Sequence, residues 1–288
     1  SEIIYARTFN ASSSHQNPIN QIGRRWGGYG GWWGGCGLSM ELVDDYDMIN
    51  GEPAFIWEGG VKKVNPASGY DPANPFKDRD PRMDMCVIHE GSVFHGETYE
   101  FWIAADGETW GYDNFRNSGD NPQSNLQLRK FMPPEGVPLN WQEKYVMPWI
   151  YFRLAEIYLN FAEAAFELGK EDECREYVNK IRARVGMPGL PASVTGETLR
   201  TRLYNERRIE LVFEEHRYFD VRRWKIAEEV FNRPGHGVKV VKEADGTKTY
   251  SYEKLLDRAF TKEMYLLPIA TDELRKNNGT LEQTWTWR

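Results

Sequence analysis

The sequence predicts a mainly α protein with extensive irregular loops, which contains one tetratricopeptide-like helical hairpin and one small β-hairpin. Two observations carry this prediction. Long stretches of apolar residues at helical spacing occur between residues 147 and 232. Residues 1–146, by contrast, are interrupted throughout by Gly, Pro, Asn and Ser. We therefore expect one region, 1–288, made of a loop-rich part (1–146), a helical part (147–232) and a C-terminal hairpin with an extended tail (233–288).

The loop-rich part contains one helical signal, at residues 38–48. Ser39 stands where an N-cap belongs, and the acidic residues Glu41 and Asp44 occupy the first turns. The other apolar runs in this part are short. We expect a short helix here and loops elsewhere.

Two amphipathic helices joined by a short turn are predicted between residues 147 and 186. A glycine follows each of them, Gly169 and Gly186, in the position of a left-handed C-terminal cap. The apolar stripes consist of Leu154, Ile157, Tyr158, Phe161, Ala165 and Leu168 in the first helix, and Cys174, Tyr177, Val178, Ile181 and Val185 in the second. Alanines on the first helix allow the close approach that is typical of tetratricopeptide pairs, although one pair is too few for a repeat array.

Two more helices are predicted downstream. The third starts near Thr195 or Glu197 and runs to about residue 216, and the fourth covers residues 217–231. Together with the first two helices they make up the helical part.

Beyond the helices, the pattern indicates extended chain. Segments 237–241 and 248–252 flank an Asp245-Gly246 turn, which predicts a small exposed β-hairpin. The apolar run at residues 264–269 predicts a short buried strand or extended segment. The tail after it is rich in tryptophan.

Composition and charge exclude several classes of protein. The 288 residues are 40% hydrophobic and 27% charged, which is a globular composition. A formal net charge of -7 argues against binding to nucleic acid or to anionic membrane surfaces, because both require clustered Lys and Arg. No apolar run approaches the roughly 20 residues of a membrane span, and the N-terminus does not resemble a signal peptide. The chain is interpreted as a mature product or a fragment.

The three cysteines, Cys36, Cys86 and Cys174, cannot all pair within the chain. Cys174 lies on the apolar stripe of the second helix, so it is interpreted as a core thiol. Whether Cys36 and Cys86 form a disulfide is left open by the spacing. No Cys-x-x-Cys pair is present, so the cysteines predict no metal site.

Three acidic residues of the helical part, Glu206, Glu210 and Asp220, are candidates for glycoside hydrolysis, which needs two carboxylates. Arginines surround all three in the sequence. A general acid needs a raised pKa, whereas neighbouring arginines lower it. We interpret these residues as an ion-pair network between helices and expect no catalytic site.

Metal and cofactor signals are weak. His89 and His95 are six residues apart in a predicted loop, which is not the spacing of a helical metal pair. Residues 71–84 contain four aspartates but no EF-hand spacing, and Arg79 and Arg82 can neutralise them, so calcium binding by this loop is left open. No phosphate loop, dinucleotide fingerprint or serine-hydrolase motif occurs. No cofactor and no metal are expected.

A glycine-rich segment in the loop-rich part predicts the ligand site. Residues 27–37 read GGYGGWWGGCG, and the aromatic residues in and beside this segment are Trp26, Tyr29, Trp32 and Trp33. Glycines supply no apolar area and allow turns that direct rings outward. Because a sugar ring has one apolar face, a flat aromatic platform suits it. The alternative, that the rings pack on the helical part, is left open.

A second candidate patch follows at Trp102, Trp110 and Tyr112. The polar residues beside it, Asp113, Asn114 and Arg116, are expected to serve ligand hydroxyls. Trp57 and Trp141 have apolar neighbours and are instead expected to pin loops to the core.

Several blocks of the sequence closely resemble the SusD/RagB family. They are residues 151–170 with the NKIRAR block at 179–184, ERRIELVFEEHRYFDVRRW at 206–224 and MYLLPI at 264–269, preceded in order by residues 41–53 and 77–88. The resemblance covers most of the chain and corresponds to the family's C-terminal portion. It implies a lipid-anchored protein of the outer-membrane surface that binds glycans, or sometimes peptides, and caps a TonB-dependent barrel.

The resulting expectation is non-catalytic binding of an oligosaccharide by the aromatic loops, followed by its delivery to a SusC-like transporter. The resemblance implies that a lipid anchor outside this chain attaches the full-length protein to the membrane. A peptide-binding member of the same system, a glycoside hydrolase and a helical-repeat scaffold for protein tails remain as alternatives. The identity of the ligand is left open.

Overall fold

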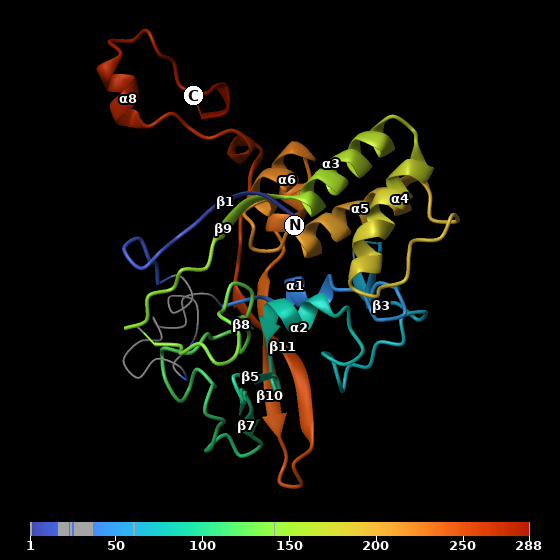
Figure 1. Ribbon diagram of the computed structural model, residues 1–288, viewed down its shortest axis with the longest axis vertical. Coiled ribbons are helices and arrows are strands. Elements are labelled where there is room, and N and C mark those ends of the chain that lie inside the picture. Colours follow the sequence, from blue (N-terminus) through green and yellow to red (C-terminus); the bar gives the residue numbers. More distant parts are fainter. Residues whose placement is uncertain are drawn as a thin grey trace.

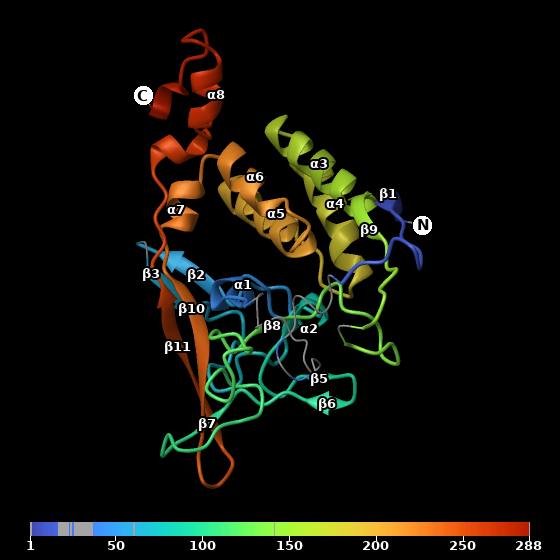
Figure 2. The same ribbon diagram turned by 90° about the vertical axis from the view of Figure 1, so that its left-hand side faces the viewer.

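The computed structural model describes residues 2–16, 23, 25, 37–59, 61–140 and 142–287. Helices gather at one end of the molecule and short strands and loops at the other, and a long two-stranded ribbon runs along one side (Figures 1 and 2). The helices in this part of the chain are α1 (Met40–Asp44), α2 (Arg82–Cys86), α3 (Leu154–Glu167), α4 (Glu171–Arg184), α5 (Gly196–Glu210), α6 (Arg217–Arg223), α7 (Ala227–Phe231) and α8 (Thr271–Lys276). Helix is the commonest regular structure, as the sequence predicts.

Most strands are short. They are β1 (Ile3–Arg7), β2 (Phe55–Glu58), β3 (Val61–Val64), β4 (Val87–Ile88), β5 (Val93–Phe94), β6 (Glu97–Thr98), β7 (Ile103–Ala104), β8 (Gln127–Leu128), β9 (Trp149–Arg153), β10 (Gly235–Lys242) and β11 (Lys248–Leu256). Four pairs form, β1 with β9, β2 with β3, β4 with β8 and β5 with β6, beside a sheet in the order β11-β10-β7. The sequence does not indicate the strands of the loop-rich part, because alternation is not visible over two to five residues.

The first two predicted helices are present as α3 and α4, which pack against each other and against α5. Their shared core includes Leu159, Cys174 and Val178, which are fully buried. Gly169 has a φ of 73° directly after α3, as the predicted left-handed cap requires. Tetratricopeptide-like packing of the pair stays a prediction.

The first helix starts later than predicted. Residues 149–153 form β9 and pair antiparallel with β1. Trp, Ile, Tyr and Phe in this stretch favour a strand when a partner is available, and that partner lies almost 150 residues away in the sequence. The sequence pattern alone could not distinguish this strand from the first turns of α3.

The third and fourth predicted helices are both interrupted. Thr195 precedes α5 as predicted, but α5 ends at Glu210, and Phe213 and Glu215 have positive φ angles of 61° and 66°. The expected fourth helix is divided into α6 and α7 because Lys225 takes a φ of 60°. A positive φ cannot continue a right-handed helix.

The predicted β-hairpin is confirmed, with Gly246 at a φ of 89° in its turn, but it is neither small nor fully exposed. Strands β10 and β11 form the ribbon of Figure 1. Val238 and Val240 on β10 are buried in the main core, and Asn125 Nδ2 donates to the Val238 carbonyl at 2.8 Å. One face of the ribbon therefore holds the loop-rich part together.

Of the two forms predicted for residues 264–269, the structure excludes the buried strand. Met264 and Tyr265 end a 3-10 turn (Lys262–Tyr265), Leu266 is extended, and Leu267 is 67% exposed. The chain then leaves the body and carries α8 away from the other helices (Figures 1 and 2). Beyond this point the tail is held by bonds of its own, for example between Gln283 and the backbone of Ile269 at 2.8 and 3.1 Å.

The main core lies under α1, α2 and β10 and includes Met40, Val43, Met83 and Leu126. Cys86 and Cys174 are buried free thiols, as expected for Cys174, and Cys36 lies outside the described residues. Within the described ranges, no helix combines the length and the apolar character needed to cross a bilayer.

Candidate ligand-binding surface

The second predicted aromatic patch lies on a loop that leaves and rejoins β7. Ile103 bridges to Trp110, and the Ala104 amide donates to the Thr109 carbonyl at 2.8 Å. Ile103 also pairs with Val241 of β10, so the ribbon fixes the base of this loop. Trp110 emerges at the surface and is 38% exposed.

Gly111 determines how the next aromatic ring is presented. Its amide donates to the Trp102 carbonyl at 2.8 Å, and a Cβ at this position would lie 2.2 Å from the carbonyl oxygen of Glu100. Only glycine allows this close approach. Tyr112 follows directly and is 43% exposed, so two rings reach the surface on either side of a residue that cannot carry a side chain.

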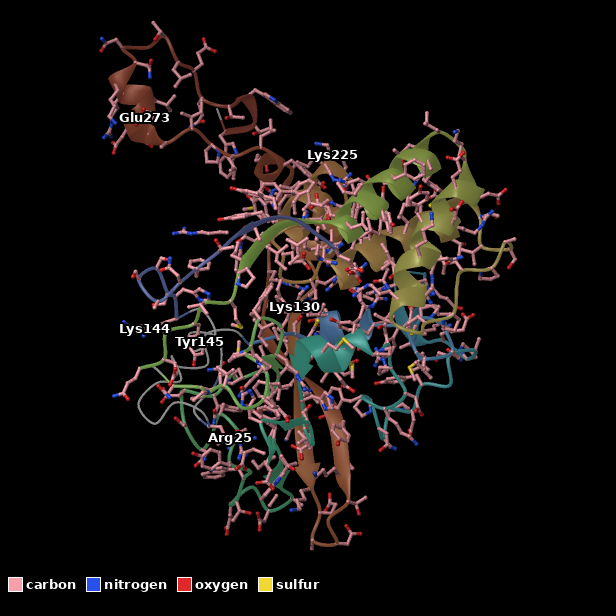
Figure 3. The ribbon with its side chains drawn as sticks, in the orientation of Figure 1. Arg25, Lys130, Lys144, Tyr145, Lys225 and Glu273 are labelled. Carbon is pink, nitrogen blue, oxygen red and sulfur yellow. The ribbon has the colours of Figure 1, made fainter. Side chains whose placement is uncertain are left out.

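An ion pair fixes Tyr112 from behind. Arg25 donates to both oxygens of Asp113, at 2.9 and 2.5 Å, and Asp113 also accepts from the Glu100 amide at 2.8 Å. The Arg25 guanidinium lies 4.8 Å from the centre of the Tyr112 ring. Figure 3 shows Arg25 among the loops, far from the helical end. Bidentate geometry of this kind gives strong, directional pairing.

Burial raises the pKa of Asp113, and the hydrogen bonds from Arg25 and the Glu100 amide partly offset this effect. Burial in turn lowers the pKa of Arg25, but Asp113, with smaller contributions from Tyr99 and Glu97, more than compensates, so that the net pKa is raised. Asp113 is fully buried. Asp113 therefore supports the loop from inside, and Arg25, itself largely covered, also pairs with the exposed Glu97 at 3.2 Å.

The other predicted residues of this patch divide into two groups. Asn114 is buried: its Nδ2 donates to the Phe101 carbonyl at 2.5 Å and its Oδ1 accepts from the Arg116 amide at 2.9 Å. Both side-chain amide atoms of Asn114 are therefore used in contacts inside the protein, and they do not reach ligand hydroxyls as expected. Arg116 is exposed, and its predicted contact with ligand hydroxyls stays a prediction. Trp102 is half-buried, and its Nε1 donates to Glu100.

The first predicted patch, Trp26, Tyr29, Trp32 and Trp33, lies outside the described residues. Its flanking residues are described. The Gly23 amide donates to Gln127 Oε1 at 3.1 Å, and Gly37 forms a β-bridge with the same Gln127. Arg25, which contacts Tyr112, directly precedes Trp26 in the sequence. Sequence analysis did not identify Arg25, although its position before the tryptophan-rich segment was the available signal.

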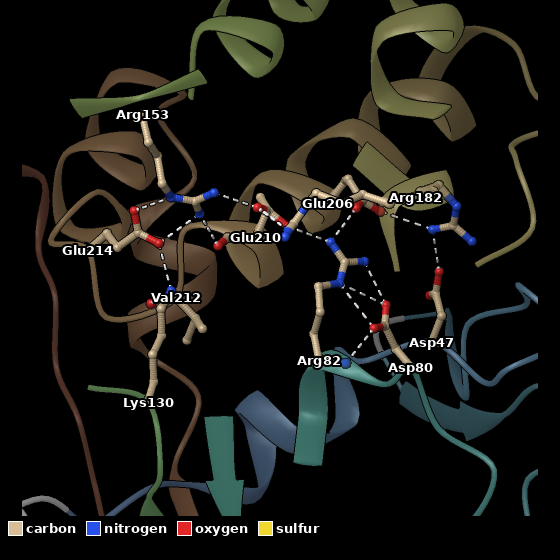
Figure 4. Close-up of polar contacts among 11 residues, drawn as sticks. Asp47, Asp80, Arg82, Lys130, Arg153, Arg182, Glu206, Glu210, Val212 and Glu214 are labelled. Atoms are coloured by element: carbon tan, nitrogen blue, oxygen red, sulfur yellow. Dashed lines mark hydrogen bonds and ion pairs between the residues drawn. The ribbon is translucent and has the colours of Figure 1, made fainter. Parts of the chain in front are cut away.

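Two of the candidate hydrolase acids, Glu206 and Glu210, lie in a buried ion-pair network (Figure 4), and the third, Asp220, is buried and held by arginines as well. Glu206 accepts from Arg82 at 2.6 Å and from Arg182 at 3.0 Å. Asp220 pairs with Arg207 at 2.8 Å, and with Arg223 at 2.9 Å. Each of these carboxylates therefore has two arginine partners.

Glu210 is the centre of this network. It pairs with Arg153 at 2.6 Å, with Arg184 at 2.7 Å and with Arg82 at 3.0 Å. Burial alone would raise the pKa of Glu210, but these arginines lower it to about 2. A carboxylate with this pKa cannot donate a proton near neutral pH. The interpretation of the acids as a network between elements is confirmed.

The network connects the two main parts of the chain. Arg82 on α2 belongs to the loop-rich part, and it reaches Glu206 and Glu210 on α5. Lys130 adds a second link, because its Nζ donates to the Val212 carbonyl at 2.7 Å and pairs with Glu214 at 2.6 Å (Figure 4). The ion pairs thus position the loops on the helices.

The aspartates of residues 71–84 do not converge. Asp71 accepts from Asn74, Asp80 pairs with Arg82, and Asp84 accepts from His89. Across the described ranges, no three His, Cys, Asp or Glu side chains gather as metal ligands would.

A further aromatic hollow was not identified in the sequence. It has a volume of about 180 Å³ and is lined by Phe131, Trp149, Tyr151 and Phe219 together with Ile150, Glu214, Glu215 and His216. The Phe131 and Trp149 rings lie 5.2 Å apart. These residues come from three distant segments, which explains why sequence spacing gave no signal for them.

Comparison with known proteins gives a consistent picture. The sequence model of the SusD family matches residues 1–287. SusD-like protein P2 of Formosa agariphila is 28% identical over 183 residues, which are 61% of this chain and 33% of that protein.

Two solved structures from Bacteroides fragilis NCTC 9343 are similar over almost the whole chain. A SusD-like protein is 30% identical with a TM-score of 0.73, covering 99% of this chain and 54% of that one. A SusD-like carbohydrate binding protein is 26% identical with a TM-score of 0.72, covering 95% and 53%. The chain thus spans about half the length of these structures and a third of the curated relative.

Proposed function

The chain belongs to the SusD family, and from this premise we propose that it binds a glycan at the cell surface without cleaving it. The observation that carries the proposal is the exposed pair Trp110 and Tyr112. Gly111 and the Arg25–Asp113 ion pair hold this pair in place. Flat rings with nearby charged groups suit a sugar, which has an apolar face and a rim of hydroxyls.

The proposed site joins both predicted patches. Its contact residues are Trp26, Tyr29, Trp32, Trp33, Trp102, Trp110, Tyr112 and Arg116, with Asn114 supporting the loop from behind. The position of Arg25 supports this union, because Arg25 stacks on Tyr112 and directly precedes Trp26 in the sequence.

Two observations support binding without catalysis. The paired carboxylates of α5 and α6 are held by arginines, and the pKa of Glu210 is about 2. A similar solved structure is described as a SusD-like carbohydrate binding protein.

Membership of the family also supports a cellular location and a partner protein. We propose that the full-length protein is lipid-anchored at the outer-membrane surface and passes its ligand to a SusC-like, TonB-dependent transporter. The loop-rich end would hold the ligand, and the ion-pair network would hold this end on the helices during transfer.

Calorimetric titration against a glycan panel and a peptide mixture tests the proposal. A Trp110→Ala, Tyr112→Ala variant is compared with Trp285→Ala, which removes a 73% exposed ring from the remote tail. A Trp32→Ala, Trp33→Ala variant tests the first patch. Stacked rings are worth about 0.5–1.5 kcal/mol each, so we expect about fivefold or greater weakening of saccharide binding in the double variants and none in Trp285→Ala.

Other outcomes would contradict specific parts of the proposal. Unchanged affinity in both double variants excludes the aromatic site. Release of shorter saccharides on long incubation shows catalysis. Binding of peptides alone favours the peptide-binding alternative.

A further inference from the structure

An aromatic hollow lies between β9 and the stretch of chain that joins α5 to α6. Its walls include the rings of Phe131, Trp149, Tyr151 and Phe219. Its volume is about 180 Å³, which is close to the roughly 150 Å³ of an apolar protein cavity that binds one benzene molecule. The hollow is therefore large enough to hold one compact chemical group.

Contacts with residues outside the hollow hold two of these rings in place. Tyr151 stacks on Tyr5 of β1, with ring centres 5.6 Å apart, and Phe219 makes a T-shaped contact with Tyr218 at 5.1 Å. The Arg222 guanidinium lies 3.5 Å from the centre of the Tyr218 ring. Because these rings are positioned in advance, a ligand that contacts them loses little affinity to the ordering of side chains.

Two acidic residues, Glu214 and Glu215, line the hollow as well. Glu214 is paired with Lys130 at 2.6 Å and with Arg153 at 2.7 Å (Figure 4). Glu215 is exposed, and among the described residues no hydrogen bond or ion pair engages its carboxylate. In the part of the chain that the structure describes, no Lys or Arg lines the hollow. Its charge is therefore negative, and it comes from Glu215.

The backbone at Glu215 is strained. Its φ is 66°, and Phe131 on another wall of the hollow has a φ of 69°. Residues with a Cβ adopt this left-handed region at a cost that glycine does not incur, and residues that are kept in it cluster at ligand sites. The conformation of these two residues supports a role of their side chains in binding.

This arrangement favours a positively charged ligand. The faces of aromatic rings carry partial negative charge, and rings that surround a cation are a common means of recognising quaternary ammonium groups. The Glu215 carboxylate adds a full negative charge, which attracts a cation and repels an anion. His216, the remaining polar lining residue, has its Nε2 3.5 Å from a carboxylate oxygen of Glu156, so its ring is engaged within the protein.

We propose that the hollow binds an organic ammonium group, with the aromatic rings around the cation and the Glu215 carboxylate as its counter-ion. A quaternary ammonium compound such as choline, or the protonated amine of an amino sugar, can supply this group. The hollow lies at β9 and α6, far from the aromatic loop at β7 (Figures 1 and 2). The ammonium site is therefore separate from the glycan site proposed at Trp110 and Tyr112.

Calorimetric titration at pH 7 and constant ionic strength tests the proposal with choline and its uncharged analogue 3,3-dimethyl-1-butanol, which has the same shape. Choline is expected to bind about threefold or more tightly than the analogue, because the rings and the counter-ion attract only the charged molecule. Glucosamine and N-acetylglucosamine form a second charged and uncharged pair. Tighter binding of glucosamine than of choline identifies an amino sugar as the ligand, and tighter binding of choline identifies a quaternary ammonium group; either result supports the proposal.

Two variants remove the groups that carry the proposal. Glu215→Gln removes the charge, and Phe219→Ala removes a ring that is 65% exposed, and each is expected to weaken choline binding about threefold or more. The controls are Glu253→Gln on β11, an exposed acid outside the hollow, and Trp57→Ala on β2. The sequence predicted that Trp57 would pin its loop to the core, but the residue is 49% exposed. Neither control should change choline binding.

Thermal unfolding of Glu215→Gly separates binding from a structural role. Glycine adopts a φ of 66° without strain, so the Tm should equal or exceed that of the wild type while choline binding falls. A marked fall in Tm, unchanged choline binding in Glu215→Gln, or equal binding of choline and 3,3-dimethyl-1-butanol would overturn the proposal. The Trp110→Ala, Tyr112→Ala variant should bind choline normally, which separates this test from that of the glycan site.

Discussion

Replacement of Glu210 by Gln tests how much the buried network stabilises the protein. Glu210 has a pKa of about 2 in the folded state, against an ordinary value of 4.5. Each pKa unit corresponds to about 1.4 kcal/mol, so the ionised carboxylate stabilises the fold by about 3 kcal/mol near neutral pH. Gln has nearly the same shape without the charge, and it stands in for the protonated acid. We expect Glu210→Gln to lower the free energy of unfolding by about 3 kcal/mol at pH 7.

The same reasoning gives a pH dependence. Because the pKa of Glu210 is depressed in the folded state, its contribution is fully present above about pH 4.5 and is lost as the pH falls toward 2. At pH 3 the unfolded state is almost fully protonated at this residue, and about 1 kcal/mol remains. Urea unfolding followed by tryptophan fluorescence at pH 7 and pH 3 measures both values.

Glu176→Gln is the matched control, because Glu176 pairs with Lys180 on the exposed face of α4. We expect a change of less than about 0.5 kcal/mol for this variant. An equal loss at pH 7 and pH 3 in Glu210→Gln would show that shape, not charge, accounts for the effect. A loss no larger than that of Glu176→Gln at pH 7 would refute the stabilising role of the network.

Two further predictions concern the loop and the helical core. Gly111→Ala places a methyl group 2.2 Å from the Glu100 carbonyl oxygen, so we expect it to destabilise the protein by about 1–3 kcal/mol in urea unfolding and to weaken saccharide binding. Gly119→Ala is the control, because the space around Gly119 is open, and it should have neither effect. Equal effects of the two substitutions would contradict the close approach at Gly111. Cys174 is buried, and its pKa is raised to about 11. Peptide mapping after treatment with iodoacetamide at pH 8 should therefore find Cys174 unmodified in the native protein and alkylated in urea. Rapid alkylation of the native protein would contradict its burial.

The helical part was largely predictable because its signals are local. Apolar spacing and Gly169 identified α3 and α4, and Asp245-Gly246 identified the ribbon. Strand β9 was not predictable, since it depends on pairing with β1, far away in the chain. The run at residues 264–269 resembles a buried strand in composition, but among the described residues no strand pairs with it.

The candidate surface was predictable in its residue types and not in its supports. The aromatic rings among glycines predicted a ligand site, and that site stays a prediction. Asn114 donates to the carbonyl of Phe101, 13 residues away, and Arg25 pairs with Asp113, 88 residues away. Such pairs are set by the tertiary fold, which no local pattern encodes.

Gln127 accepts a hydrogen bond from the Gly23 amide and forms a β-bridge with Gly37, so both ends of the segment between these glycines are held at one residue. This arrangement has an evolutionary consequence. A segment that starts and ends at one point can change its length or its sequence without displacing the body, because loop closure costs rise only slowly with length. Variation can therefore be confined to the intervening residues while the ribbon and the ion-pair network stay constant. If the proposed site is correct, exchange of this one segment between relatives would change the ligand preference on an unchanged scaffold.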